Sequence, residues 1–136
     1  MMPQVHLVVG AVVSAAIWPF LGDDGAISLV AWALVGGAVG AVIDMDIMVI
    51  VAAAARGDAS LRRWTDPRNV GRDFKGFIGM LRSRGLLRKA AVTHLAMGAA
   101  LVGAFWLLVP SLLVPAVVGA FTHLVSDLQY LSPPAL

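Results

Sequence analysis

Arg56 to Lys89 reads RGDASLRRWTDPRNVGRDFKGFIGMLRSRGLLRK and contains all ten Lys and Arg residues of the 136-residue chain. Ten bases against three Asp give this segment a net charge of +7. The sequence on either side of it is nearly uncharged and contains no Glu. Basic residues confined to one loop between apolar segments are typical of a membrane protein whose loop lies in the cytoplasm.

The composition also indicates a membrane protein. Hydrophobic residues make up 60% of the chain, charged residues make up 13%, and the mean hydropathy is +0.87. These values lie outside the range of soluble domains, and the length suits a single domain. The basic segment contains no nucleic-acid motif, so we expect it to face anionic lipid headgroups and not nucleic acid. The chain has no Cys, so any metal site must use nitrogen and oxygen ligands.

Four apolar segments surround the basic loop, which predicts an all-α, polytopic membrane protein with four transmembrane helices. Their approximate bounds are 4–21, 26–55, 90–109 and 111–131. The second segment exceeds the roughly 20 residues needed to cross a bilayer, so it must tilt, break near Asp44-Met45-Asp46 or run along the interface. The acidic turn at 22–25 suits the outer side. We therefore expect loop 56–89 and both termini to be cytoplasmic, with the protein in the inner or plasma membrane.

The loop itself carries a helical pattern. Four large apolar residues recur at the spacing of one helix face, namely Phe74, Phe77, Ile78 and Leu81. This spacing predicts an amphipathic helix within 73–88 that lies on the cytoplasmic leaflet. Asp66-Pro67 predicts a helix start. Three glycines weaken the pattern, so a solvated loop with partial helix remains the alternative.

The predicted orientation places six ionisable residues at one depth, near the cytoplasmic face. His6 begins the first span, and Asp44 lies roughly 27 Å along a helix from Ala26. His94 lies roughly 6 Å into the third span. The full set is His6, Asp44, Asp46, His94, His123 and Asp127. Ionisable groups in membrane segments indicate a functional site, because their burial there costs roughly 2.5–3.5 kcal/mol each on insertion scales.

The spacing of these residues predicts a shared metal site. His123 and Asp127 lie four residues apart, on one face of one helix, which allows joint ligation or an imidazole–carboxylate bond. An unbroken helix would point Asp44 and Asp46 about 200° apart, so either one ligates while the other supports it, or the helix opens there to line a cavity. We treat all six residues as candidate ligands, and Asp44 and Asp46 as candidate general bases. His and carboxylate ligands suit a divalent transition metal, with Zn²⁺ the first expectation and Mn²⁺, Fe²⁺ or Ni²⁺ the others.

Each residue also has a purely structural interpretation. His6 suits a membrane interface, and the Asp44–Asp46 pair could end a helix. His123 and Asp127 could form a buried hydrogen-bonded pair that holds helices together.

The motifs resemble, in the same order, those of the YdjM-like family. They are His6, the Asp-x-Asp at 44–46, Thr93-His94-Leu95 and THLVSD at 122–127. Members of this family are small membrane proteins described as metal-dependent hydrolases, some of them as LexA-binding. The resemblance covers essentially the whole chain and implies the same six residues as metal or catalytic groups. This chain departs from the family pattern at Ile43, where the family usually has Pro, and at Lys89, where it often has His.

Together these observations predict a membrane-embedded hydrolase that uses metal-activated water on an ester or phosphoester of a lipid-like substrate at the cytoplasmic leaflet. The alternative is a non-enzymatic membrane protein. It would be either a carrier of metal ions or protons, or a scaffold that docks a soluble partner through its basic loop. The sequence leaves open the substrate, the metal and whether the protein forms a homo-oligomer.

Overall fold

The computed structural model describes residues 3–22 and 28–131, with the backbone alone described for 129–131, and all regular secondary structure within these residues is helical. The predicted outer turn lies mostly outside the described residues. The helices in chain order are α1 (Pro3–Leu21), α2 (Leu29–Ile43), α3 (Met45–Ala54), η1 (Ala59–Thr65), α4 (Pro67–Arg72), α5 (Phe74–Ser83), α6 (Leu86–Leu108), η2 (Pro110–Leu112) and α7 (Leu113–Leu131).

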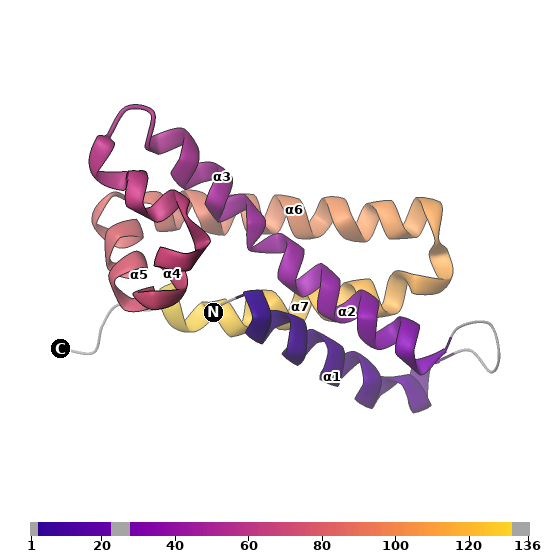
Figure 1. Cartoon of the computed structure of the whole chain (residues 1–136). Coiled ribbons are helices and arrows are strands. Elements are labelled where there is room, and N and C mark those ends of the chain that lie inside the picture. The colour runs from indigo at the N-terminus through magenta and orange to yellow at the C-terminus, as the bar shows by residue number, and fades with distance from the viewer. Residues whose placement is uncertain (1–2, 23–27, 132–136) are drawn as a thin grey trace.

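Four helical segments are long and apolar enough to cross a membrane: Pro3–Leu21, Leu29–Ala54, Leu86–Leu108 and Pro110–Leu128. The predicted all-α class and the four long helices are therefore confirmed. Figure 1 shows that α1 begins and α7 ends at the end of the bundle where α4 and α5 lie. The third helix begins at Leu86, earlier than predicted, because Gly85 adopts a left-handed conformation (φ 66°) and separates it from α5. Arg88 and Lys89 consequently belong to its first turns.

Small residues bring α1, α2 and α7 close together. A Cβ atom added to Gly36 would overlap the Ser14 hydroxyl of α1 and lie 2.8 Å from the Gly10 carbonyl oxygen. On the other side of α2, a Cβ atom added to Gly119 of α7 would come within 3.1 Å of the Gly36 Cα. Close backbone approach of this kind is how apolar helices gain van der Waals contact within a membrane.

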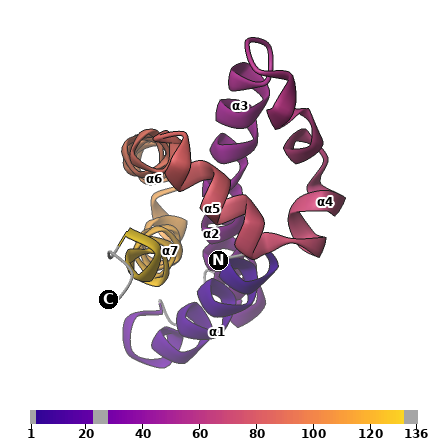
Figure 2. The same ribbon diagram turned by 90° about the vertical axis from the view of Figure 1, so that its left-hand side faces the viewer.

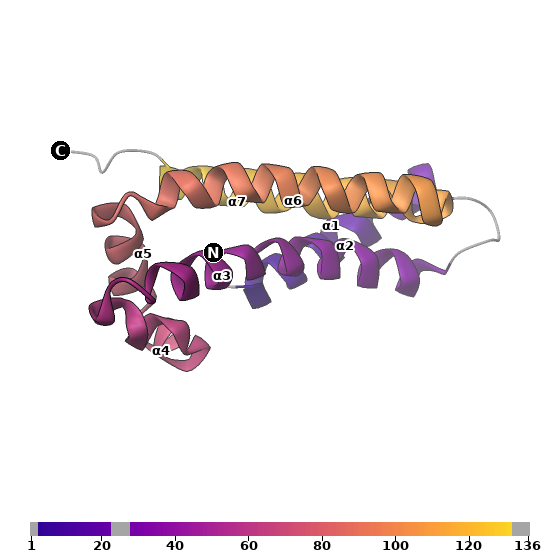
Figure 3. The ribbon, with the colours of Figure 1, turned by 90° about the horizontal axis from the view of Figure 1, so that it is seen from above.

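The second predicted span breaks at Asp44, which is one of its three expected outcomes. Asp44 follows the last residue of α2 and precedes the first residue of α3. Beyond the break, α3 packs against α6 and η1. Figure 3 shows α3 diverging from α6, with α5 bridging the two at the end of the bundle.

The basic loop folds into short helices that cover this end. Asp66 accepts the Arg68 N–H at 2.8 Å and starts α4, as predicted from Asp66-Pro67. Asp73 accepts the Gly76 N–H at 2.9 Å and starts α5. Arg84 at the end of α5 pairs with Asp58 at 2.6 Å, which ties α5 back to the start of η1. Figure 2, viewed from this end, shows α5 crossing in front of α2.

The apolar face of α5 packs on protein. Phe77 and Leu81 are buried in a cluster with Val51 of α3, Trp64 of η1 and Leu86 of α6. The predicted helix is therefore present, and its two most buried apolar residues contact α3, η1 and α6. The contact of this helix with a lipid leaflet stays a prediction.

Candidate metal centre

All six candidate residues meet in one cluster at the end of the bundle that α4 and α5 cover. They come from α1, α6, α7 and the junction of α2 with α3. Five of them are buried, and the Asp127 side chain retains 19% of its exposure. The shared depth that the sequence predicts is thus accompanied by direct contacts across four helices.

His123 carries the most informative geometry of the cluster. Its Nδ1–H donates to the carbonyl oxygen of Gly40 at 2.6 Å, and a carbonyl oxygen can only accept. The neutral ring therefore keeps an unprotonated Nε2. This atom is buried without a hydrogen-bond partner among the described residues, 3.5 Å from Asp127 Oδ2 and 3.9 Å from Asp44 Oδ1. A buried nitrogen lone pair that faces two carboxylates is a favourable site for a cation.

The carbonyl group that orients His123 lies beside the break in the second span. Gly40 belongs to the last turn of α2, four residues before Asp44. A carbonyl oxygen has two lone pairs, so it can accept the His123 N–H in addition to a helical hydrogen bond. The Asp44 carboxylate and the carbonyl group that orients His123 therefore come from the same end of α2.

His94 is oriented in a comparable way by a carboxylate. Its Nδ1 lies 2.7 and 2.8 Å from the two oxygens of Asp46, so the ring donates from Nδ1 and turns Nε2 inward. Nε2 lies 3.7 Å from Asp127 Oδ2 and 3.9 Å from Asp44 Oδ1. Asp46 thus stands behind His94, a common arrangement for imidazole groups that ligate metals.

His6 bridges two carboxylates. Its Nδ1 lies 2.8 Å from Asp44 Oδ2, and its Nε2 lies 3.3 Å from Asp127 Oδ1. Its ring also packs against that of His123, with the ring centroids 4.1 Å apart. His6 therefore lies between Asp44 and Asp127 on the side of α1. Its Nδ1 is hydrogen-bonded to Asp44, while its Nε2, like that of His123, is buried without a hydrogen bond among the described residues.

The remaining four residues fit a single divalent ion. Each of Asp44, His94, His123 and Asp127 offers one donor atom, and these atoms all lie within 4.8 Å of one another. Tetrahedral zinc bonds of ~2.1 Å hold donor atoms ~3.4 Å apart, so an ion would draw the widest pair together by up to roughly 1.4 Å. Among the described residues, Asp44 and Asp46 form ion pairs with His alone. A cation would balance this buried negative charge, and the donor set suits Zn²⁺ or another first-row transition metal.

A cavity of about 430 Å³ borders the cluster. Asp44, His94 and Asp127 form part of its wall, together with Gln4 of α1. The rest of the wall is mainly apolar and comes from α3, α4, α5, α6 and α7, including Val70, Phe74, Phe77 and Ala91. Asp44, at the break between α2 and α3, therefore borders a cavity.

Two features of this site have no direct signal in the sequence. The partner of His123 is a backbone carbonyl group, which no side-chain pattern reveals. The cavity depends on how α4 and α5 pack over the long helices, although the apolar face of α5 was visible in the sequence. Compared with known proteins, no family model, curated protein or solved structure matches this chain. The resemblance to the YdjM-like family stays a prediction.

Proposed function

We propose that this protein is a membrane-embedded, metal-dependent hydrolase of esters or phosphoesters in lipid-like molecules. The observation that carries the proposal is the buried, unpartnered Nε2 of His123, which faces Asp44 and Asp127 beside a cavity. Buried polar atoms in native proteins almost always have partners, so an orphan of this kind calls for an explanation. A divalent cation satisfies both the lone pair and the carboxylates.

The proposal gives each residue a distinct role. In the catalytic state His94, His123 and Asp127 would hold the ion and leave its fourth position open to water, with the Asp44 carboxylate beside it as a base. When bound, a divalent ion lowers the pKa of a water molecule and polarises the carbonyl or phosphoryl oxygen of the substrate. Asp46 would orient His94, and His6 would hold the two carboxylates that it bridges.

We assign proton transfer to the carboxylates on the cavity wall. Asp44 borders the cavity, whereas Asp46 is not among the described residues that line it. Of the two bases that the sequence offers, Asp44 is therefore the one we propose, with Asp46 as a positioning residue. The water oxygen bonds to the carbonyl carbon or the phosphorus, and Asp44 accepts the water proton. The bond to the leaving oxygen breaks, and that oxygen takes the proton from Asp44.

The distribution of polar groups favours hydrolysis over transport. A carrier needs polar groups along a path across the membrane. The cluster lies at one end of the bundle, and outside the cluster Ser14 is the other buried polar side chain among the described residues. The scaffold alternative does not explain the cavity beside the His and Asp residues.

The experiment is a substrate screen on metal-loaded protein in detergent and in liposomes. The substrates are a phosphatidate, a polyprenyl phosphate and simple carboxyl esters. We expect turnover that a chelator abolishes and that His123→Ala removes together with the bound metal, measured by elemental analysis. Asp66→Asn, on the exposed loop, is the matched control and should keep both. Protein that retains its metal and hydrolyses none of these substrates would favour the non-enzymatic alternatives.

A further inference from the structure

The cavity beside the cluster has two chemically different ends. One end carries Asp44, His94 and Asp127, and the rest is mainly apolar. A volume of about 430 Å³ lies toward the lower end of the range of pockets that enclose one small ligand, roughly 300–1,000 Å³. This volume suits a ligand with one hydrocarbon chain.

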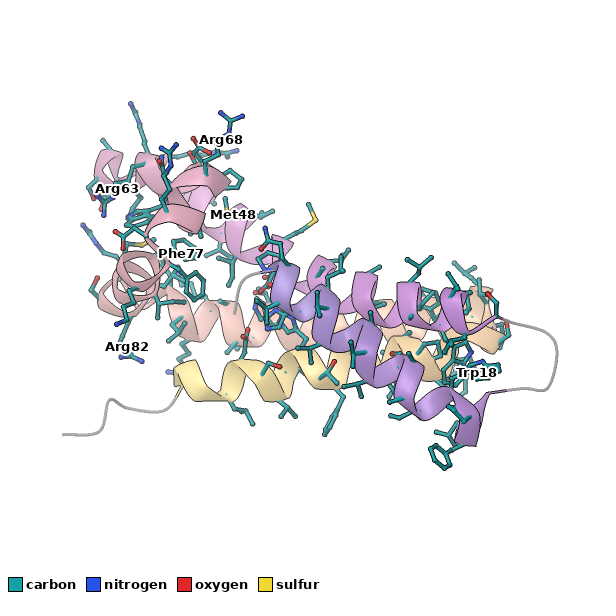
Figure 4. All side chains as sticks on the ribbon, turned by 60° about the horizontal axis from the view of Figure 1, so that its bottom comes forward. Trp18, Met48, Arg63, Arg68, Phe77 and Arg82 are labelled. Atoms are coloured by element: carbon teal, nitrogen blue, oxygen red, sulfur yellow. The ribbon has the colours of Figure 1, made fainter. Side chains whose placement is uncertain are left out.

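The helices that form the outer wall of the cavity also carry positive charges. Val70 and Gly71 of α4 and Phe74 of α5 line the cavity, while Arg68 and Lys75 on the same helices are exposed. Among the described residues, no carboxylate forms an ion pair with Arg68, Arg72 or Lys75. Figure 4 shows Arg63, Arg68 and Arg82 extending outward from the loop helices. An anionic head would therefore meet positive charge on its way to the cavity.

We propose that this cavity binds the tail of a single-chain amphiphile whose anionic head lies at the His and Asp cluster. The inference rests on the proposed function for the chemistry at the head, and it adds the class of substrate. Hydrocarbon in a bilayer is as apolar as the cavity wall, so burial of the tail yields little hydrophobic gain. The contribution of the cavity is to hold the tail so that the bond next to the head reaches Asp44 and Asp127.

The charges of the cluster set a condition on binding. Asp44 and Asp127 lie on the cavity wall and would repel a phosphonate or phosphate group. A bound divalent cation neutralises these two negative charges and offers a positive centre to the head group, so an anionic head requires the cation and a neutral head does not.

The test uses a non-hydrolysable probe, a hexadecyl phosphonate with a diazirine at the tail end, and mass spectrometry to locate the photo-crosslinks. We expect labelling of α4 and α5 residues that line the cavity. Ala91→Phe should reduce it about tenfold or more, because the larger side chain fills the cavity. Ala96→Phe is the matched control, since Ala96 lies on the same helix and is exposed.

A second pair of variants distinguishes a blocked cavity from a misfolded protein. Gly71 and Gly79 both have open space at the Cβ position, but Gly71 lines the cavity and Gly79 is not among its described lining residues. Gly71→Trp should reduce labelling, whereas Gly79→Trp should leave it unchanged. A chelator should reduce labelling by the phosphonate probe and should not affect a hexadecanol probe with the same diazirine.

The outcomes separate this inference from the proposed function. Labelling spread evenly over exposed apolar residues, and unchanged by Ala91→Phe and Gly71→Trp, would overturn the cavity site even if the protein hydrolyses soluble esters. Cavity labelling that responds to both variants, in a protein that hydrolyses nothing, would support the binding site and count against the hydrolase. Phosphonate labelling that a chelator leaves unchanged would overturn the placement of the head at the cluster.

Discussion

Asp46→Asn tests how the carboxylate behind His94 controls metal affinity. Asp46 accepts the Nδ1–H of His94 at 2.7–2.8 Å, and it is not one of the four residues whose donor atoms converge. Asparagine keeps the size of the side chain and one acceptor oxygen, so the substitution removes mainly the negative charge. That charge makes the His94 ring a better electron donor and fixes its orientation.

The expected loss of metal affinity follows from the hydrogen bond between Asp46 and the metal-binding residue His94. Loss of such a partner typically weakens metal affinity by about 10–100-fold, or roughly 1.4–2.7 kcal/mol. We expect Asp46→Asn to fall in the lower half of this range, because the amide oxygen still accepts the hydrogen bond. Asp46→Ala should reach the upper half, since it removes the acceptor as well.

The assay is competition for Zn²⁺ against a chelator of known affinity, with the protein in one detergent. Asp66→Asn, which changes an exposed Asp in the same way, is the control and should leave the affinity unchanged. In a His94→Ala background, Asp46→Asn should have almost no further effect, because Asp46 acts through His94. A Zn²⁺ affinity unaltered by both Asp46 substitutions, or an equal loss in the His94→Ala background, would refute this reasoning.

Two further predictions concern packing and topology. Gly36→Ala should destabilise the protein by about 1–3 kcal/mol through overpacking, because its Cβ would overlap Ser14, and should therefore lower the unfolding temperature in detergent. Gly103 has open space at the Cβ position, so Gly103→Ala should leave the unfolding temperature unchanged. Equal unfolding temperatures for the two variants would contradict the close approach of α1 and α2. The chain has no Cys, so Ser60→Cys and Ser111→Cys are clean single labels, and an impermeant thiol reagent should reach them from opposite sides of the membrane. Labelling of both from outside would contradict the predicted cytoplasmic loop.

The parts of this fold that the sequence predicts are those set by local chemistry. Hydropathy over about 20 residues defines the long helices, since each helix satisfies its own backbone hydrogen bonds in lipid. Asp66-Pro67 starts α4 because an Asp side chain accepts an early N–H group and Pro lacks one. The break at Asp44 was one of several outcomes, because whether a long apolar segment tilts or breaks depends on its neighbours.

The separate roles of the residues in the cluster are only partly predictable from the sequence. The angle of about 200° between Asp44 and Asp46 predicts that the two acids take different roles. Which of them faces the shared centre depends on the packing of α2 and α3 against α6, which brings His94 to Asp46. The role of His6 as a bridge between Asp44 and Asp127 depends on the distance between α1 and α7, which no spacing within one helix encodes.

The free-energy cost of burying the carboxylates of the cluster supports the proposed metal. Three carboxylates lie together here, and ionisable groups at membrane depth cost roughly 2.5–3.5 kcal/mol each on insertion scales. Hydrogen bonds from His6 and His94 offset part of this cost, but the His123 nitrogen facing Asp44 and Asp127 adds a lone pair where a donor would stabilise them. An arrangement meant only to join helices would place an N–H group at that position. The His123 tautomer fixed by Gly40 does the reverse, and a cation between His123 and the carboxylates turns this local repulsion into attraction.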